Sequence, residues 1–235
     1  MASSRKKKIL AGCGTVLLVA LLTLFVMARP LLFPRKWDVV PITADARYQD
    51  ATLLARAMQL PAARHYASQL VYQPNPSFCG PTTVANVLRS FGHEGATPQA
   101  MIEGTSLCRF GICFGGISLD ELQALMSQRT CSSVDLLRDL SLPAFREQLR
   151  HTNEEGVRYT INFDRGPLFG RSGGHHSPIG GYLEDEDLVL VLDVNDKYHP
   201  WLVRSERLFA AMNTVDGSSG KRRGMLRISH DGCRR

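Results

Sequence analysis

The stretch QPNPSFCGPTT, residues 73–83, places a single cysteine between a proline-rich approach and a Gly-Pro step. Residues 80–91 follow with apolar side chains at helical spacing, and Gly92 comes next as a natural stop. Cys79 is therefore expected directly before a helix. A cysteine in such a position can be a buried core residue, half of a disulfide, a metal ligand or a nucleophile. The rest of the chain must discriminate among these roles.

The remainder of the chain changes from helical patterns to strand patterns. A capping box of Ser118 and Glu121 predicts one helix start, and β-branched, apolar runs predict strands at 157–163 and 188–194. Between these runs, a glycine-rich stretch leads into a further strand. The other expected elements are helices within 45–71 (broken at Pro61), 143–151 and 205–212, and a last strand at 224–229. A helical half followed by a sheet half predicts an α+β fold.

The composition is that of a globular protein with one domain of ordinary to large size. The chain has 235 residues, of which 44% are hydrophobic and 21% are charged. The formal net charge of +6 comes partly from basic residues near both ends. Because no basic stripe is interleaved with aromatic residues, we do not expect nucleic acid as a partner.

Residues 9–28 form an apolar run without charge, long enough for a helix that spans a membrane. The cluster RKKK precedes the run, which favours an inner-membrane, single-pass anchor with the following domain in the periplasm. We therefore expect an anchor at 1–29, a linker at 30–44 and a catalytic domain at 45–235. Two alternatives stay open, a lipoprotein signal at LAGC (10–13) and signal-peptide cleavage after VMA (26–28).

The sequence has six cysteines, and three of them, Cys108, Cys113 and Cys131, lie close together near the middle of the chain. Their spacing does not match a zinc ribbon, and an extracytoplasmic domain permits disulfides. The sequence leaves two alternatives, a disulfide among these three or three unpaired buried thiols.

A nucleophilic cysteine needs help to ionise, because its unperturbed pKa of about 8.5 leaves little thiolate at neutral pH. A helix start and a histidine that accepts the proton both provide this help. His175 follows the glycines of SGG, and Asp193 lies at the end of an apolar strand, where a carboxylate can orient an imidazole. Taken alone, each of the three residues also has an ordinary role, as packing, a surface histidine or a strand-end cap.

Several motifs together resemble the phytochelatin synthase family. QPNPSFCG is followed by GHHSPIGGY (174–182) and LDV (192–194), in the order and with the interval between histidine and aspartate that the family shows. GICFGGISL (111–119) and GKRRGML (220–226) are similar to two further segments of the family. The resemblance covers roughly residues 45–230.

The resemblance implies a papain-like cysteine peptidase fold and an acyl-enzyme formed from glutathione. It implies Cys79 as nucleophile, His175 as general base and acid, and Asp193 as the group that orients the imidazole. Gln73 would supply the oxyanion-hole donor. The remaining pair, Asp216 and Arg223, would hold the α-amino and α-carboxylate groups of the γ-glutamyl moiety.

The chain also departs from the family pattern. DVNDKYHP (193–200) is one residue shorter than the family segment that helps to seat a second thiol substrate, and Asn195-Asp196 stand where a basic residue is usual. Asn75 replaces the acidic residue of the plant enzymes, and the cysteine-rich C-terminal extension of the eukaryotic enzymes has no counterpart here. These changes favour hydrolysis over polymer synthesis, as in the short bacterial members of the family.

The resemblance thus predicts an enzyme of the glutathione γ-glutamylcysteinyltransferase type that removes glycine from glutathione or its conjugates, and the apolar run at 9–28 predicts that it is membrane-anchored. No cofactor or metal site is required, and heavy-metal ions such as cadmium would enter as thiolate complexes of the substrate. Three alternatives stay open: phytochelatin synthesis by transpeptidation, a papain-like peptidase acting on another short peptide, and a non-catalytic protein that binds thiols or heavy metals. In the last alternative the ligands would be Cys79, Cys108, Cys113 and Cys131.

Overall fold

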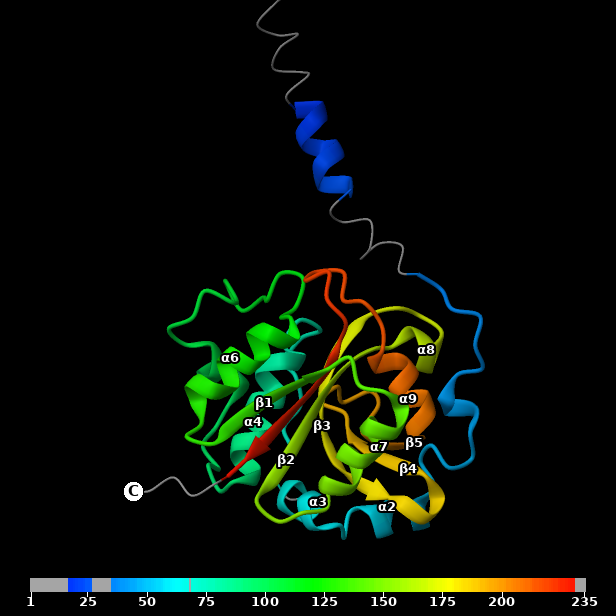
Figure 1. The fold of residues 1–235 in the computed structure, drawn as a ribbon. Coiled ribbons are helices and arrows are strands. Elements are labelled where there is room, and N and C mark those ends of the chain that lie inside the picture. The colour runs from blue at the N-terminus through cyan, green and yellow to red at the C-terminus, as the bar shows by residue number, and fades with distance from the viewer. Residues whose placement is uncertain (1–16, 27–34, 68, 231–235) are drawn as a thin grey trace, which may run out of the picture. The chain divides into compact units, whose positions relative to one another are not determined.

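The computed structural model describes residues 17–26, 35–67 and 69–230, and the chain divides into one unit before Trp37 and one from Trp37 onward (Figure 1). Residues 17–26 are helical. The expected membrane span at 9–28 lies partly outside the described residues. Within the described part of the chain, no helix is both long and apolar enough to cross a membrane, so the anchor stays a prediction.

The second unit is built on one antiparallel sheet of six strands in the order β1-β6-β2-β3-β4-β5 (Figure 1). The central strands are almost wholly buried, which explains why they read as continuous apolar runs rather than as alternating ones. The strands are β1 (Ser133–Arg138), β2 (Val157–Asp164), β3 (Gly174–Leu183), β4 (Leu188–Leu192), β5 (Pro200–Arg204) and β6 (Gly224–Ser229).

Helices cover both faces of the sheet and form separate apolar cores with it. On one face, α4 (Cys79–Ser90), α5 (Pro98–Ile102) and α6 (Leu119–Arg129) pack with Leu226 and Ile228 of β6. On the other, α7 (Leu142–His151) and α9 (Ser205–Met212) pack with apolar side chains of the central strands (Figure 1). A third cluster joins α2 (Ala51–Ala57) and α3 (Pro61–Tyr66) to β4 and β5. The short helix α8 (Gly166–Phe169) lies in the connection from β2 to β3.

The α+β architecture with an antiparallel sheet confirms the class expected from the sequence. The capping box of Ser118 and Glu121 is present with both of its reciprocal hydrogen bonds. Two differences concern the site: Cys79 is the first residue of α4 rather than the residue before it, and the GHHSPIGGY motif is itself strand β3 rather than a stretch that leads into one. Strands β1 and β5 were not expected.

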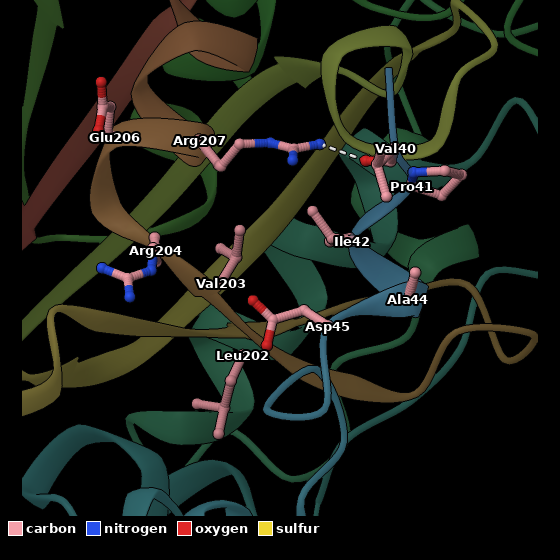
Figure 2. Close-up of a pocket in the computed structure, with 10 residues that line it drawn as sticks. All are labelled: Val40, Pro41, Ile42, Ala44, Asp45, Leu202, Val203, Arg204, Glu206 and Arg207. Carbon is pink, nitrogen blue, oxygen red and sulfur yellow. Dashed lines mark hydrogen bonds between the residues drawn. The ribbon is translucent and has the colours of Figure 1, made fainter.

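Residues 37–45 begin the second unit and pack against the rest of it. The backbone N–H of Trp37 donates to the Gly170 carbonyl (2.9 Å), and Ile42, in the 3-10 helix η1 (Ile42–Ala44), is buried in the core. A cavity of about 370 Å³ separates this segment from β5 and α9, and Arg207 closes one side by donating to the Val40 carbonyl (Figure 2). None of the site residues expected from the sequence lines this cavity.

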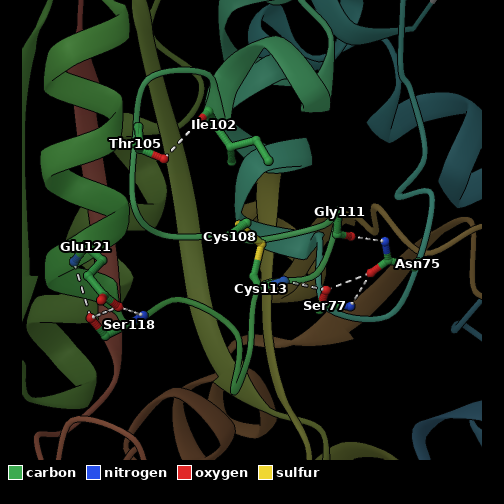
Figure 3. Close-up of a disulfide and its surroundings, with 9 residues drawn as sticks. All are labelled: Asn75, Ser77, Ile102, Thr105, Cys108, Gly111, Cys113, Ser118 and Glu121. Atoms are coloured by element: carbon green, nitrogen blue, oxygen red, sulfur yellow. Dashed lines mark hydrogen bonds between the residues drawn. A yellow bond between two sulfur atoms is a disulfide. The ribbon is translucent and has the colours of Figure 1, made fainter.

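Cys108 and Cys113 form a disulfide that closes the loop between α5 and α6 (Figure 3). Cys131 is also disulfide-bonded, so the alternative of three unpaired buried thiols is wrong. The loop docks beside the start of α4: the Asn75 amide donates to the Gly111 carbonyl (3.0 Å), and the Cys113 N–H donates to the Ser77 hydroxyl (3.0 Å). The disulfide thus stiffens a loop that lies next to Cys79 in the fold.

The same loop ends in a close approach to Gly80, the residue after Cys79. A Cβ atom built on Gly80 would lie 2.2 Å from Cδ1 and 2.4 Å from Cγ1 of Ile117. Ile117 is buried, and its branched side chain has few rotamers to move into. Glycine at position 80 is therefore required for this loop to cover the first turn of α4.

We expect Gly80→Ala to lower the free energy of unfolding. Alanine normally stabilises a helix interior by about 1 kcal/mol relative to glycine. Here overpacking against Ile117, which typically costs about 1–3 kcal/mol, reverses the sign. Urea denaturation measures the effect, with Gly95→Ala as control because open space surrounds Gly95. A Gly80→Ala protein as stable as the wild type would contradict the packing argument.

Candidate active site

Cys79 is buried at the first position of α4, where helix N–H groups and the helix dipole favour negative charge. It is the free cysteine among the described residues. The His175 side chain and the backbone N–H of His176 lie close enough to the thiol to lower its pKa. The sulfur therefore faces an imidazole and an N–H donor, both of which stabilise a thiolate.

His175 lies at the start of β3 and reaches from Cys79 to Asp193. Its Nε2 lies 2.8 Å from Oδ1 of Asp193, which leaves Nδ1 for the contact with the Cys79 thiol. Phe163 of β2, directly opposite in the strand pairing, contacts the ring edge-to-face with a centroid distance of 5.4 Å. The strand pairing and the aromatic contact together fix the plane of the imidazole between the two acidic groups.

Asp193, the first residue after β4, is fully buried and accepts hydrogen bonds on both carboxylate oxygens. Besides His175, the donors are Trp201 Nε1 to Oδ2 (3.0 Å), the Asn195 N–H to Oδ1 (2.9 Å), and Arg165 Nη2 at 3.0 Å from each oxygen. A buried carboxylate is stable only when its charge is paired and its lone pairs are satisfied, and this site meets both conditions.

The pKa values of the three residues shift in the directions that favour an ion pair. Burial alone raises the pKa of the Cys79 thiol, but the hydrogen bond and charge of His175, the His176 N–H and Arg165 outweigh it, so the pKa is lowered. Burial and Arg165 lower the pKa of His175, but Asp193 and the Cys79 hydrogen bond raise it above its usual value. Burial opposes the Asp193 charge, yet His175, Arg165 and Trp201 hold that pKa well below its usual range.

Gln73 lies at the same end of the sheet as the histidine and the aspartate. Its backbone N–H donates to the carbonyl of Val194, the residue after Asp193 (2.8 Å). Its Oε1 atom is buried and has no hydrogen-bond partner among the described residues. Gln73 is thus joined to the site through its backbone.

Asp216 and Arg223 form a buried ion pair, with 3.3 Å between Arg223 Nη2 and Asp216 Oδ1. The hydroxyls of Ser218 and Ser219 donate to Oδ2 of Asp216 at 2.8 and 3.1 Å. Burial raises the pKa of Asp216, but the Ser218 hydroxyl and Arg223 outweigh it, so the pKa is lowered and the carboxylate is charged at neutral pH. The sequence brings these two charges together through the turn at 216–221, whose ends pair as Val215 and Arg222.

The ion pair adjoins the histidine. A Cβ atom on Gly174 would lie 2.8 Å from Nη1 of Arg223, so the guanidinium covers the residue just before His175. Arg223 Nη1 also donates to Asn162 Oδ1 (3.1 Å), and the Asn162 amide lies against the His176 ring. His176 in turn donates to the Ile117 carbonyl (2.9 Å), and burial lowers its pKa to about 4, so this ring is neutral.

Of the six site residues expected from the sequence, Cys79, His175 and Asp193 lie side by side, and the pair of Asp216 and Arg223 adjoins them at Gly174. Gln73 is joined to the site through its backbone. The structure adds three residues that the sequence reasoning missed: Arg165, Trp201 and Asn162. The sequence did contain an indication for Trp201, because a tryptophan within the apolar segment PWLVR carries an N–H that needs a buried acceptor. It contained none for Arg165 and Asn162, since their partners lie far along the chain.

Within the described residues, no three His, Cys, Asp or Glu side chains come together in a way that could hold a metal ion. Chemically, a thiol beside an oriented imidazole can serve as a nucleophile, because the imidazole can accept its proton and return it to a leaving group.

We expect alkylation of Cys79 by iodoacetamide to accelerate at a lower pH than that of an ordinary thiol, whose pKa is about 8.5. In His175→Ala, the thiol keeps its burial, which raises its pKa, but loses the partner that lowers the pKa most. Alkylation should therefore begin at a higher pH than in the wild type. His151→Ala, at a half-buried histidine on α7 that is paired with Glu154, is the control. Mass spectrometry of the Cys79 peptide gives the rate at each pH. Identical profiles for the wild type and His175→Ala would show that His175 does not tune the thiol.

Comparisons with known proteins identify the family. The family model described as phytochelatin synthase matches residues 46–225. Glutathione gamma-glutamylcysteinyltransferase 1 of Arabidopsis thaliana is 29% identical over 86% of this chain and 45% of its own length. Glutathione gamma-glutamylcysteinyltransferase of Schizosaccharomyces pombe is 28% identical over 73% of this chain and 45% of its own length. The chain thus spans less than half the length of these curated relatives.

Among solved structures, the peptidase domain of Streptococcus ComA aligns with 68% of this chain and 97% of its own length, at 13% identity and a TM-score of 0.47. The family match extends over most of the second unit and includes all six site residues. On this match, the chain belongs to the phytochelatin synthase family.

Proposed function

We propose that this protein is a cysteine-dependent enzyme of the glutathione γ-glutamylcysteinyltransferase type that acts mainly as a peptidase on glutathione or its conjugates. The observation that carries the proposal is the His175 ring, which lies 2.8 Å from Asp193 and next to Cys79, with the pKa of the thiol lowered and the pKa of the imidazole raised. The names of the relatives support glutathione as the substrate.

In the proposed first step, the Cys79 thiolate attacks the carbonyl carbon of the Cys-Gly peptide bond. The tetrahedral intermediate carries its charge on oxygen, and Gln73 is proposed to donate to that oxygen. Loss of such a donor typically raises the barrier by about 2.7–4 kcal/mol. The C–N bond then breaks, and the His175 imidazolium gives its proton to the leaving amine of glycine, which leaves a thioester on Cys79.

In the second step, His175 takes a proton from water as the water attacks the thioester, and γ-glutamylcysteine leaves while the thiol is restored. Asp193 keeps the imidazole oriented in both steps and stabilises its cationic form. A second glutathione in place of water would give a phytochelatin. The changes at Asn195-Asp196 favour water, since no basic side chain stands at these two positions to seat a second thiol substrate.

A papain-like arrangement is part of the proposal. It is supported by a helix that begins at the cysteine and packs against an antiparallel sheet that carries the histidine and the aspartate. No cofactor is proposed, and heavy-metal ions would enter as thiolate complexes of the substrate. The alternative of soft-metal binding by four thiols loses support, because Cys108 and Cys113 are joined and Cys131 is disulfide-bonded.

We also propose that the domain works outside the cytoplasm, attached to the inner membrane. The disulfide of Cys108 and Cys113 supports this location, because disulfides persist in oxidising compartments. The apolar run at 9–28 and its basic N-terminal flank support the attachment.

The full chain, incubated with glutathione with and without cadmium, is expected to release equal amounts of γ-glutamylcysteine and glycine, which mass spectrometry resolves. Cys79→Ala is the control and should release neither. Longer (γ-Glu-Cys)n-Gly products would show that transpeptidation competes with water. Product formation by Cys79→Ala at the wild-type rate would refute the assignment of the nucleophile.

We expect Arg223→Lys to raise KM for glutathione by about 10–100-fold with a smaller change in kcat. Arginine is proposed to hold the α-carboxylate with a planar fork, and hydrogen bonds to charged groups contribute about 1.5–3 kcal/mol. Lysine keeps the charge beside Asp216 but not the fork. Arg222→Lys, at the neighbouring and more exposed arginine, is the matched control. Circular dichroism first verifies that both variants fold, and steady-state kinetics then gives KM and kcat for each. Equal KM values for Arg223→Lys and Arg222→Lys would count against binding of the α-carboxylate by Arg223.

A further inference from the structure

The tip of the disulfide-closed loop places a large apolar residue where the backbone disfavours one. Arg109 and Ile112 exchange two backbone hydrogen bonds of 2.9 Å, and the two residues between them have positive φ, 52° at Phe110 and 73° at Gly111. This is a two-residue hairpin turn whose first position normally takes asparagine, aspartate or glycine. Phenylalanine there is strained, and its side chain is 99% exposed, so core packing does not account for it.

Two more apolar side chains accompany Phe110 at the surface, and we refer to Phe110, Ile112 and Phe114 as the aromatic loop. Phe114 is 72% exposed and Ile112 is 45% exposed. Residues 104–117 carry a single charge, on Arg109. The disulfide and the contacts to Asn75 and Ser77 hold the loop in shape (Figure 3). A stiff, nearly uncharged loop with exposed aromatic rings fits the boundary between lipid headgroups and acyl chains.

The attachment of the N-terminal segment lies at the same end of the catalytic unit. Trp37 binds the connection from β2 to β3 through the Gly170 carbonyl and the Ser172 hydroxyl (2.7 Å), shortly before His175. The aromatic loop binds Ser77, shortly before Cys79. Because Cys79 and His175 are in contact, both attachments flank the same pair of residues, and Figure 1 shows α8 and the loop between α5 and α6 at the same end of the ribbon.

The length of the tether then favours a bilayer as the partner. The apolar run ends at residue 28, and residues 29–36 lie between it and Trp37. Eight residues reach at most about 30 Å when fully extended. A chain anchored through the apolar run would keep the end that carries the aromatic loop close to the lipid surface, at a high effective concentration.

We propose that Phe110 and Phe114 insert into the interfacial layer of the bilayer and hold the catalytic unit with its Cys79 end toward the membrane. The inference rests on the expected N-terminal anchor and not on the proposed enzymatic activity. Its partner is the lipid surface itself, reached mainly through apolar burial, so the contact should depend little on salt.

Tryptophan quenching in vesicles tests the insertion with the full chain. Phe110→Trp is reconstituted into zwitterionic vesicles and compared with vesicles whose lipids carry bromine on the acyl chains. The fluorescence added by this tryptophan, above the background of Trp37 and Trp201, should fall at least about twofold in brominated lipid. Glu94→Trp is the control, because Glu94 is exposed beyond the far end of α4, a helix about 18 Å long.

Equal quenching of Phe110→Trp and Glu94→Trp would overturn the proposal. So would a blue-shifted Phe110→Trp emission that brominated lipid does not quench, since a protein surface would then cover the loop. Failure of the chain to float with vesicles would also overturn it.

A second variant separates insertion from folding. Phe110→Asn creates the Asn-Gly pair that this turn prefers, so we expect the melting temperature to stay the same or rise. Quenching of a tryptophan at Phe114→Trp should nevertheless decrease in the Phe110→Asn background, because the loop inserts as one unit. Unchanged quenching at position 114 would contradict a joint insertion.

Discussion

The buried carboxylate of Asp193 is the constraint on which the rest of the site depends. A full charge with no solvent contact is unstable unless donors surround it, and each donor here comes from a different part of the chain. His175 comes from β3, Trp201 from β5, Arg165 from the turn after β2, and the fourth is the backbone of Asn195. Satisfying one carboxylate thus ties four segments of the sheet half together. It also sets the tautomer and the orientation of the imidazole that Cys79 faces.

The cysteine is positioned by the helical half through close approach rather than through charge. Gly80 lets Ile117 lie on the first turn of α4, and the Ile117 carbonyl accepts from the neutral ring of His176. His176 follows His175 in β3, and its backbone N–H reaches the Cys79 sulfur. The two adjacent histidines therefore have opposite roles. The first is raised in pKa by a carboxylate and a thiol, whereas the second is kept neutral by burial and acts as a spacer between the halves.

The sequence predicted what is local or carried by motifs, and it missed what depends on distant partners. The helix at α4, the capping box at Ser118 and the central strands follow from periodicity and residue type. Strand β1 alternates only weakly in burial and lies at the sheet edge, so SVDLLR gave no strong signal. Arg165 could not be found, because its role arises only when the turn after β2 meets the end of β4. The pairing of Cys108 with Cys113 depended on a turn that folds the loop back on itself.

The pair of Asp216 and Arg223 shows how the same logic extends to a ligand. In the free protein the two charges neutralise each other in a nearly buried position, with two serine hydroxyls on the carboxylate and one amide on the guanidinium. The Nε of Arg223 is buried without a partner among the described residues. A ligand with adjacent ammonium and carboxylate groups could satisfy both charges at once. Such a zwitterion is what the γ-glutamyl end of the proposed substrate offers and what most peptide N-termini lack. This match supports the proposed role of Asp216 and Arg223.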